Sequence, residues 1–333
     1  MSLTFYFIGV TTRQSSIMQV FPLWMRILGR PDVEINGIDL KLHDEVDIYR
    51  RVVQQIKDDP SVLGALVTTH KLDLLDAARD LFDHLDSNAQ LCHEVSCISK
   101  QDGRLEGHAM DPISAGKSLD AILGHDYFAR TGGQVLCLGT GGSAIAIALH
   151  FARKANAGDR PARFIAVNRS QPRLDALQTM LANVGSNMPV NYVLNDDPQR
   201  NDTLMAQLPD GSLVINATGM GKDRPGSPVS DMGLFPRHGI AWELNYRGEL
   251  QFLHQVRGQS SMRDVRVEDG WLYFLHGWLS VIAQVLHIDI STQQFTELAL
   301  AADHLRPAPP PIALDGQQTH ADVPAASDRS TDA

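Results

Sequence analysis

Short apolar runs alternate along the chain with longer segments in which apolar residues recur three and four positions apart. The apolar runs, typical of buried strands, lie at residues 3–9, 33–40, 62–67, 135–138, 163–167, 190–194, 213–217, 239–244 and 264–267. The segments with helical spacing lie at 20–28, 45–57, 72–85, 114–123, 145–149, 173–184, 271–288 and 293–305. Strands that alternate with helices predict an α/β fold with mainly parallel sheets.

A β-hairpin is predicted within this alternation. Residues 95–99 and 105–108 have strand character, and Asp102-Gly103 between them is a typical hairpin turn. The chain then continues through a predicted helix to a second α/β unit, which opens at residue 135. We therefore expect two α/β units in succession.

The second unit begins with a strand, a glycine turn and a helix start, in the order Val-Leu-Cys-Leu-Gly-Thr-Gly-Gly-Ser-Ala at 135–144. Gly139 permits a tight turn, Gly141 lets backbone N–H groups approach a pyrophosphate, and Ala144 lets the helix pack closely on the strand. The helix dipole would face the phosphates. This spacing predicts dinucleotide binding by Gly139, Thr140, Gly141, Gly142, Ser143 and Ala144. A glycine turn in an α/β domain without a nucleotide is the alternative.

The end of the next strand indicates which dinucleotide is bound. An acidic residue there would bind the ribose 2′-hydroxyl of NAD, whereas an arginine can pair with the 2′-phosphate of NADP. The tip reads Asn168-Arg169-Ser170, Arg173 follows one helical turn on, and the nearest acid is Asp175. We therefore predict NADP as the cofactor. Solvated arginines without a ligand are the alternative.

Composition and charge narrow the class of protein. The chain has 333 residues, 43% of them hydrophobic, which is enough for two domains with their own cores. A net charge of −10 argues against nucleic-acid binding. No apolar run reaches membrane length and no leader peptide opens the chain, so we expect a cytoplasmic protein. The three cysteines and thirteen histidines show no metal-ligand spacing, so no metal is predicted.

Taken together, these residues and their order resemble the shikimate dehydrogenase superfamily, also called the shikimate/quinate dehydrogenases. The resemblance covers roughly residues 5–290. Its anchors are Gly9, Ser15, Val67-Thr68, His70-Lys71, Gly103-Arg104-Leu105-x-Gly107, Asp111, the loop at 139–144, Asn168-Arg169-Ser170, Asn216-Ala217-Thr218, Glu243-x-x-Tyr246 and Asp269-Gly270.

The resemblance implies a domain plan. Residues 1–115 would form an α/β substrate-binding and catalytic domain, and 116–267 a Rossmann-type NADP-binding domain. Residues 268–305 would form C-terminal helices that return to the first domain. Residues 306–333, rich in Pro, Ala, Asp and Ser, are predicted from composition to be a disordered tail. The active site would lie in the cleft between the domains, and Ala217 and Thr218 would also contact the cofactor.

The family's catalytic pair corresponds to Lys71 and Asp111. Hydride transfer to a ketone builds negative charge on oxygen, so a cation or proton donor must stand there. A dry cleft and nearby cations would lower the pKa of a lysine, and a carboxylate would oppose that shift. A solvated lysine at a helix start and an aspartate N-cap are the structural alternatives for this pair.

The substrate-binding residues implied by the resemblance are Ser15, Thr68, Ser96 and Tyr246. Several family positions differ here: the second serine becomes Ile17, the hydroxyl-binding asparagine becomes Ser96, Asn-Thr before the aspartate becomes Ala109-Met110, and the glutamine of the returning helix becomes Gly277. Each lost hydrogen bond would cost on the order of 1–3 kcal/mol. We therefore expect a divergent pocket in which Ile17, Ala109, Met110 and Trp278 add apolar surface. Arg13 is either a replacement carboxylate anchor or a solvated loop residue.

These expectations lead to one main hypothesis. The protein would be an NADP-dependent dehydrogenase acting on CH–OH donors, which interconverts a cyclic hydroxy acid and its keto form with Lys71 and Asp111 as acid–base dyad. It would be a monomer or homodimer with small-molecule partners only. The alternatives are a true shikimate or quinate dehydrogenase of the shikimate pathway and a catalytically silent NADP-binding sensor.

Overall fold

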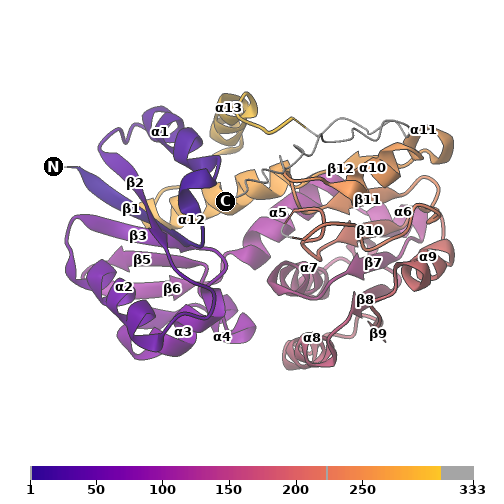
Figure 1. Cartoon of the computed structure of the whole chain (residues 1–333), viewed down its shortest axis with the longest axis horizontal. Helices are drawn as coiled ribbons and strands as arrows, with labels where there is room; N and C mark the ends of the chain where they lie inside the picture. Colours follow the sequence, from indigo (N-terminus) through magenta and orange to yellow (C-terminus); the bar gives the residue numbers. More distant parts are fainter. Residues whose placement is uncertain (1, 223, 309–333) are drawn as a thin grey trace, which may run out of the picture.

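Two six-stranded sheets stand side by side in the computed structural model, which describes residues 2–222 and 224–308 (Figure 1). The first sheet has the order β2-β1-β3-β5-β6-β4. Its strands are β1 (Leu3–Gly9), β2 (Val33–Asp39), β3 (Val62–Val67), β4 (His84–Leu85), β5 (Cys97–Gln101) and β6 (Arg104–His108). All neighbouring pairs are parallel except those of β5, which is antiparallel to β3 and β6. The predicted hairpin is therefore confirmed as β5–β6.

Alternation along β1 assigns the two faces of the first sheet. Phe5 and Phe7 face a core shared with α1 (Ile17–Ile27), α12 (Trp271–Leu286) and α13 (Thr292–Asp303). Ile8 faces a second core with α2 (Val46–Asp58) and α3 (Lys71–Ala78). Side chains two residues apart on a strand point to the same face, so both faces of this sheet are buried.

The second sheet is parallel throughout, in the order β12-β11-β10-β7-β8-β9. Its strands are β7 (Val135–Leu138), β8 (Phe164–Asn168), β9 (Val190–Leu194), β10 (Leu213–Asn216), β11 (Ile240–Glu243) and β12 (Arg266–Glu268). With β7 counted as the first strand, this is the doubly wound order 3-2-1-4-5-6 of Rossmann-type domains. The predicted fold class is confirmed.

Helices cover both faces of the second sheet. One core joins it to α5 (Asp111–Leu123), α6 (Tyr127–Thr131), α7 (Gly142–Arg153) and α8 (Gln171–Asn183). The opposite core involves α9 (Pro198–Ala206) and α10 (Gln251–Arg257), and α11 (Ser260–Arg263) follows α10.

Two helices join the halves of the molecule. α5 leads from β6 toward the second sheet and packs against α7, and α12 returns after β12 to pack against β3, β5 and α5 (Figure 1). The β-branched and aromatic side chains of α12 fill the core of the first sheet, with Val285 and Ile282 almost fully buried. The predicted return of a C-terminal helix to the first half is thus observed.

One predicted helix is shorter than its periodicity indicates. The segment 72–85 forms α3 to Ala78, then a 3₁₀ turn at Arg79–Leu81, and then the short strand β4. Asp83 explains the change, since its backbone N–H donates to the carbonyl of Leu105 and its carboxylate accepts the N–H of Leu105 and pairs with Lys57. Pairing with β6 therefore overrides the local helical pattern.

Some elements have local signals that the hydrophobic pattern does not carry. α4 (Ser87–Cys92) begins after Asp86, whose carboxylate accepts the N–H of Ala89 at 2.6 Å. α9 begins after Asp197, which caps the N–H of Gln199, with Pro198 as first helical residue. N-caps and an N1 proline are enough to predict short helices that lack a clear apolar stripe.

The C-terminal segment is described as far as residue 308. Arg306 forms an ion pair with Asp269, so the described chain passes close to the start of α12. Residues 309–333 of the predicted disordered tail lie outside the described residues. None of the helices in the described ranges has both the length and the hydropathy needed to span a bilayer.

The packing of α13 on α1 generates a stability prediction. The indole N–H of Trp24, fully buried on α1, donates to the carbonyl oxygen of Leu298 on α13 at 2.8 Å. We expect Trp24→Phe to lower the free energy of unfolding by about 1–3 kcal/mol, because it removes this bond and leaves a small cavity. Urea titration followed by circular dichroism would measure the loss as a lower midpoint at an unchanged slope. Leu300→Ala, at a residue 70% exposed on α13, is the control and should shift the midpoint little.

Candidate active site

Lys71 and Asp111 meet where two strands of the first sheet end. Lys71 is the first residue of α3, shortly after β3, and Asp111 is the first residue of α5, shortly after β6. β3 and β6 run in the same direction because β5 between them is antiparallel to both. The Nζ of Lys71 forms an ion pair and a hydrogen bond with Oδ2 of Asp111. The side chains are 20% and 17% exposed, so Lys71 is not a solvated lysine. The N-cap of α5 is Met110, so Asp111 is not the N-cap of the structural alternative.

The electrostatics of Lys71 favour its ammonium form. Burial alone lowers the pKa of Lys71, but the carboxylates of Asp111 and Glu94 outweigh burial and raise it above its usual value. None of the groups of the described chain that shift the pKa of Lys71 is a cation, so no positive charge offsets this rise. Lys71 is therefore prepared to donate a proton, or to stabilise a negative oxygen, at neutral pH.

Two further titratable residues lie near the pair, and no sequence pattern selects them. Glu94 lies just before β5 and is only 4% exposed, and burial raises its pKa to about 7. Tyr273 on α12 donates its hydroxyl to Oγ of Ser143 at 3.3 Å, and burial together with Asp111 raises its pKa. Glu94 borders an apolar run and Tyr273 stands within an apolar helix, so pattern alone indicates a solvated carboxylate and a core aromatic.

A cavity of about 920 Å³ lies along the glycine loop at the carboxyl ends of the second sheet. It is lined by nine of the residues predicted to bind the cofactor: Gly139, Thr140, Gly141, Asn168, Arg169, Ser170, Arg173, Ala217 and Thr218. Asn195, Asp196, Met220 and Arg224 line it too, and sequence reasoning did not select them. Such a crevice at the switch point of a doubly wound sheet is where dinucleotides bind.

The glycine loop has the close approach that its spacing predicts. Gly139 has φ +100, and a Cβ there would stand 2.5 Å from the carbonyl oxygen of Ala217. A Cβ on Gly141 would meet only the guanidinium of Arg173, at 3.5 Å. Gly139 therefore lets the loop press against the end of β10, and Gly141 leaves its backbone open toward the cavity.

The other half of the loop faces the first domain. Ser143 accepts the hydrogen bond from Tyr273, and Glu94 Oε2 would be 3.3 Å from a Cβ on Gly142. Ala144 is fully buried in the core behind the loop. The start of α7 is thus the place where the glycine loop meets the residues around Lys71.

The segment Asn168-Arg169-Ser170 at the end of β8 is held by side-chain hydrogen bonds. Asn168 donates its amide to Oγ1 of Thr140 at 2.8 Å and accepts the N–H of Ser170 at 2.9 Å. Arg169 and Arg173 are exposed side chains on the cavity wall, and Arg224 donates to the carbonyl oxygen of Thr218 at 3.2 Å. The cavity therefore has a cationic end.

The four predicted substrate residues divide into two kinds. Burial raises the pKa of the Tyr246 hydroxyl, and hydrogen bonds with Ser16 and Ser15 offset part of this rise, so Ser15 and Tyr246 lie together. Thr68 instead donates its hydroxyl to the carbonyl oxygen of Ile8 at 3.1 Å. Ser96, 2% exposed, accepts the N–H of Met110 at 2.7 Å. Thr68 and Ser96 thus form these hydrogen bonds with backbone groups.

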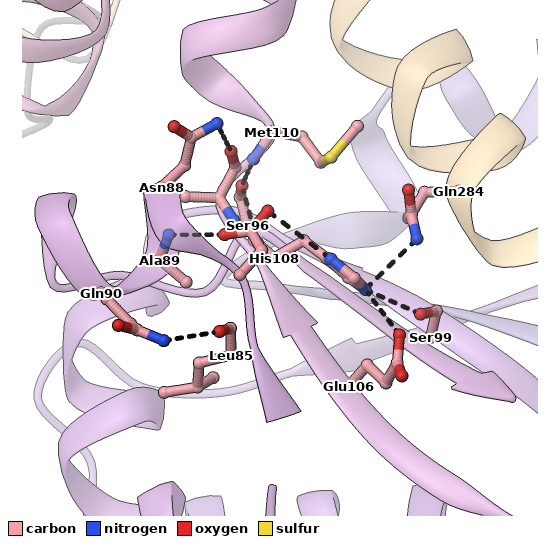
Figure 2. Close-up of polar contacts among 12 residues, drawn as sticks. Leu85, Asn88, Ala89, Gln90, Ser96, Ser99, Glu106, His108, Met110 and Gln284 are labelled. Atoms are coloured by element: carbon pink, nitrogen blue, oxygen red, sulfur yellow. Dashed lines mark hydrogen bonds and ion pairs between the residues drawn. The ribbon is translucent and has the colours of Figure 1, made fainter. Parts of the chain in front are cut away.

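A buried polar network holds the backbone at Ser96 and Met110 (Figure 2). His108 of β6 contacts the hydroxyl of Ser99 at 2.9 Å and the amide of Gln284 on α12 at 3.4 Å. Figure 2 shows these groups next to Ser96 and its bond to Met110, directly before α5. The network joins β5, β6 and α12, and so supports the position of Asp111.

The residues expected to add apolar surface to the substrate pocket lie instead in hydrophobic cores. Ile17 and Ala109 are fully buried and Trp278 is 6% exposed, all within hydrophobic cores of the first domain. The ring of Trp278 packs edge-on against Phe7 at 4.9 Å. These substitutions are part of core packing, and this corrects the expectation that they add surface to the pocket. Gly277 leaves open space, because no atom lies within 4 Å of a Cβ placed there.

Two other positions from the sequence analysis are now located. Arg13 is exposed on its loop, where it acts electrostatically on Asp39. His70 is buried, and its Nδ1 lies 3.0 Å from the hydroxyl of Tyr49. Within residues 2–222 and 224–308 there is no group of three or more side chains arranged to hold a metal ion.

Sequence comparison finds curated shikimate dehydrogenases, while no protein-family model matches the chain. The shikimate dehydrogenase (NADP(+)) of Symbiobacterium thermophilum is 31% identical over 201 residues, which cover 59% of this chain and 62% of that protein. The enzyme of the same name from Lactococcus lactis subsp. cremoris is 29% identical over 183 residues, covering 55% and 60%. The match thus spans about three fifths of the length of these relatives.

Solved structures share the fold over nearly the whole chain. The ligand-free 5-ketofructose reductase of a Gluconobacter species superposes with a TM-score of 0.67 at 17% identity, covering 92% of this chain and 99% of that one. Quinate dehydrogenase from Corynebacterium glutamicum in complex with NAD gives 0.67 at 19%, covering 90% and 99%. Shikimate 5-dehydrogenase from Thermus thermophilus, in complex with NADP(H) and shikimate, gives 0.66 at 20%, covering 90% and 99%.

The fold and site define a two-domain protein with a Rossmann-type half and an ion pair beside its glycine loop. The comparisons confirm the resemblance to the shikimate/quinate dehydrogenase superfamily that the sequence predicts.

The ion pair itself can be tested without an assay of activity. In Asp111→Asn, Lys71 loses the carboxylate that most raises its pKa, so that pKa should fall. The titration of the Lys71 amine, followed by NMR of a lysine-labelled protein, would measure the shift. Asp80→Asn, which breaks an exposed pair with Arg50, is the control and should leave the Lys71 titration unchanged. An unmoved Lys71 in Asp111→Asn would contradict the pairing.

Proposed function

We propose that the protein is an NADP-dependent oxidoreductase that interconverts a cyclic hydroxy acid and its keto form. The observation that carries this proposal is the buried Lys71–Asp111 pair beside the glycine loop of a Rossmann-type domain. The names of the curated relatives, shikimate dehydrogenase (NADP(+)), support the same reaction class and cofactor.

The residues of the second domain fit a dinucleotide. The backbone from Gly139 to Ser143 would hold the pyrophosphate at the N-terminus of α7, where the helix dipole favours an anion. Arg169 and Arg173, supported by the positions of Asn168 and Ser170, would hold a 2′-phosphate at the cationic end of the cavity. Ala217 and Thr218 form the opposite wall.

The residues of the first domain would manage the proton. A bound nicotinamide supplies or accepts the hydride. Lys71 would donate a proton from Nζ to the ketone oxygen during reduction, and Asp111 would hold the ammonium in place. Ser15 and Tyr246 would bind the substrate at the other side of the cleft, with Thr68 and Ser96 as the remaining predicted contacts.

A true shikimate or quinate dehydrogenase is the second candidate, and the names of the relatives favour it. Gly277 and Ser96 weigh against it, because the first has no side chain and the second bonds to the backbone of Met110. Both candidates use the same dyad and cofactor, so the substrate decides between them.

We expect Lys71→Ala to abolish turnover and to leave NADP binding intact. Loss of a general acid–base residue typically lowers the rate about 10²- to 10⁴-fold. The measurement is absorbance of the reduced nicotinamide with NADP or NAD and a panel of shikimate, quinate and less polar cyclic hydroxy acids. Lys41→Ala, at an exposed lysine, is the control and should be fully active.

Each result of this panel has a meaning. Rapid oxidation of shikimate would show an ordinary shikimate dehydrogenase, and activity on another compound would show a divergent one. NADP binding without turnover throughout the panel would favour a sensor without catalysis. Normal turnover by the Lys71→Ala complex would refute the role of Lys71.

The choice of cofactor is tested at the tip of β8. Arg169→Ala should weaken NADP binding about 10- to 150-fold, the equivalent of about 1.5–3 kcal/mol for a charged hydrogen bond, and should change NAD binding little. Tryptophan fluorescence or calorimetric titration with each dinucleotide would measure the ratio. Arg163→Ala, at an exposed arginine just before the other end of β8, should leave both affinities unchanged. Equal losses for NADP and NAD would contradict a 2′-phosphate contact.

A further inference from the structure

A carboxyl group outside the proposed dyad is buried between the two domains. Glu94 is 4% exposed, follows α4 and precedes β5. Its backbone is fixed on both sides, because its own N–H donates to the carbonyl of Ala89 and the N–H of Val95 donates to the carbonyl of Lys71 at 3.1 Å. Its Oε2 points toward the start of α7, 3.3 Å from where a Cβ on Gly142 would stand. The carboxyl is thus held at the junction by a rigid backbone.

Glu94 lies between α4 and β5, and the titratable groups around it belong to five helices. Lys71 on α3 attracts its carboxylate, and Asp111 on α5 repels it. The charge of Glu94 raises the pKa values of Tyr273 on α12 and of Cys92 on α4. Arg153 on α7 lowers the pKa of Cys92. Within the described part of the chain, the carboxyl of Glu94 forms no ion pair and no hydrogen bond with any of these groups. A buried carboxyl without such a partner favours its neutral form.

This arrangement separates the tasks of the two carboxyls. Asp111 is bonded to Lys71 Nζ and holds it. Glu94 is next to the residue whose N–H bonds to the backbone carbonyl of Lys71, and it acts on the Lys71 ammonium through its charge without a bond to it. Burial raises the pKa of Glu94 to about 7, with Lys71 lowering and Asp111 raising it further. Glu94 therefore gains and loses its proton in the pH range near 7, where Lys71 stays an ammonium.

We propose that Glu94 is the proton reservoir of Lys71: it restores the proton that Lys71 gives to the substrate oxygen. The proposal rests on the proposed function, because it takes Lys71 to be the proton donor. Glu94 acts through Lys71 and need not touch the substrate.

The proton balance of a reduction is then complete. The N–H bond of the Lys71 ammonium breaks as the O–H bond of the product alcohol forms, which leaves a neutral amine beside the carboxylate of Asp111. The carboxylic acid of Glu94 passes its proton to that amine, directly or through one water, and becomes a carboxylate. A proton from solvent restores the acid, so each reduction consumes one solvent proton.

After a reduction, the return of a proton to Lys71 is favourable. Transfer from Glu94 to a neutral Lys71 runs from a weaker to a stronger base. Oxidation follows the same path in reverse, in which the paired ammonium gives its proton to the Glu94 carboxylate. The relay therefore serves both directions and leaves the equilibrium of the reaction unchanged.

The first test needs no turnover. The C=O stretch of a protonated carboxyl, observed by infrared difference spectroscopy between acidic and alkaline pH, should lose intensity near neutral pH in the wild type. Glu243 is fully buried and burial raises its pKa to about 7 as well, so its carboxyl also contributes to this band. The part of the band that belongs to Glu94 is the part that Glu94→Gln removes. In Lys71→Ala its midpoint should move to higher pH, because the cation that favours the Glu94 carboxylate is gone. Lys41→Ala is the matched control and should leave the midpoint in place. A band that ignores Lys71→Ala, or titrates at an ordinary carboxyl pH, would overturn the proposal.

The second test uses the pH profile of ketone reduction with a substrate from the panel. In the wild type, kcat should fall up to tenfold per pH unit above neutral, as the acid form of Glu94 disappears. Glu94→Gln should be slower and lose this dependence, and Glu94→Asp should keep it. Glu34→Gln, at an exposed carboxyl of the edge strand β2, should retain both rate and profile. An unchanged profile in Glu94→Gln would refute the reservoir.

Failure of this inference can be distinguished from failure of the proposed function. If no compound turns over but the infrared midpoint moves in Lys71→Ala, Glu94 and Lys71 share a proton and the substrate assignment is wrong. If compounds turn over in a Lys71-dependent way while the midpoint stays, the dehydrogenase function stands and Glu94 is a buried structural acid.

Discussion

An ammonium and a carboxylate, paired in a largely shielded position at the junction of two sheets, impose the strongest constraint on this molecule. A buried charge is costly unless it is paired and held in good geometry. The fold meets that requirement by ending β3 and β6 at the same edge of the first sheet, so that Lys71 and Asp111 begin neighbouring helices. The hydrogen bond of Met110 to Ser96, with the His108 network beneath it, then holds the backbone at which Asp111 enters α5.

α5 and α12 connect this pair to the second domain. α5 starts at Asp111 and packs on α7, whose first residues belong to the glycine loop. α12 places Tyr273 against Ser143 of that loop and fills the core of the first sheet with its apolar side chains. The position of the ion pair relative to the glycine loop is thus set by packing of two helices, which is a more rigid link than a loop alone.

The sequence predicts the framework well because the framework is local. The strand, turn and helix around Gly139 follow from ten consecutive residues, and the positive φ at Gly139 with its close approach to Ala217 is what that spacing requires. The hairpin at Asp102-Gly103 is equally local. The limits of prediction appear where tertiary contacts decide, as at residues 79–85, where pairing of Asp83 with Leu105 ends a helix that periodicity would continue.

The candidate site was predictable only in part for the same reason. Lys71 and Asp111 are forty positions apart, and their proximity was inferred from resemblance, because no spacing rule joins them. Glu94 gave no signal, since a glutamate before an apolar run is ordinarily solvated, and only the fold shows that it is buried near Lys71. Ile17 and Trp278 misled in the opposite sense. Ile17 aligns with a polar family position and Trp278 lies next to one, so both suggested an apolar pocket, but α1 and α12 use them in the core.

The fold alone does not define the substrate, because proteins with this fold are named for different substrates. Solved proteins named 5-ketofructose reductase, quinate dehydrogenase and shikimate 5-dehydrogenase superpose on this chain with TM-scores of 0.67, 0.67 and 0.66, although their named substrates differ. One framework can therefore carry proteins whose named substrates differ. In this chain Ser15 and Tyr246 lie together, and Gly277 leaves open space in place of a side chain. Under the proposed function, α12 would offer a substrate no side-chain hydrogen bond at position 277, which would favour a molecule with fewer hydroxyls, or a bulkier one, over a triol acid.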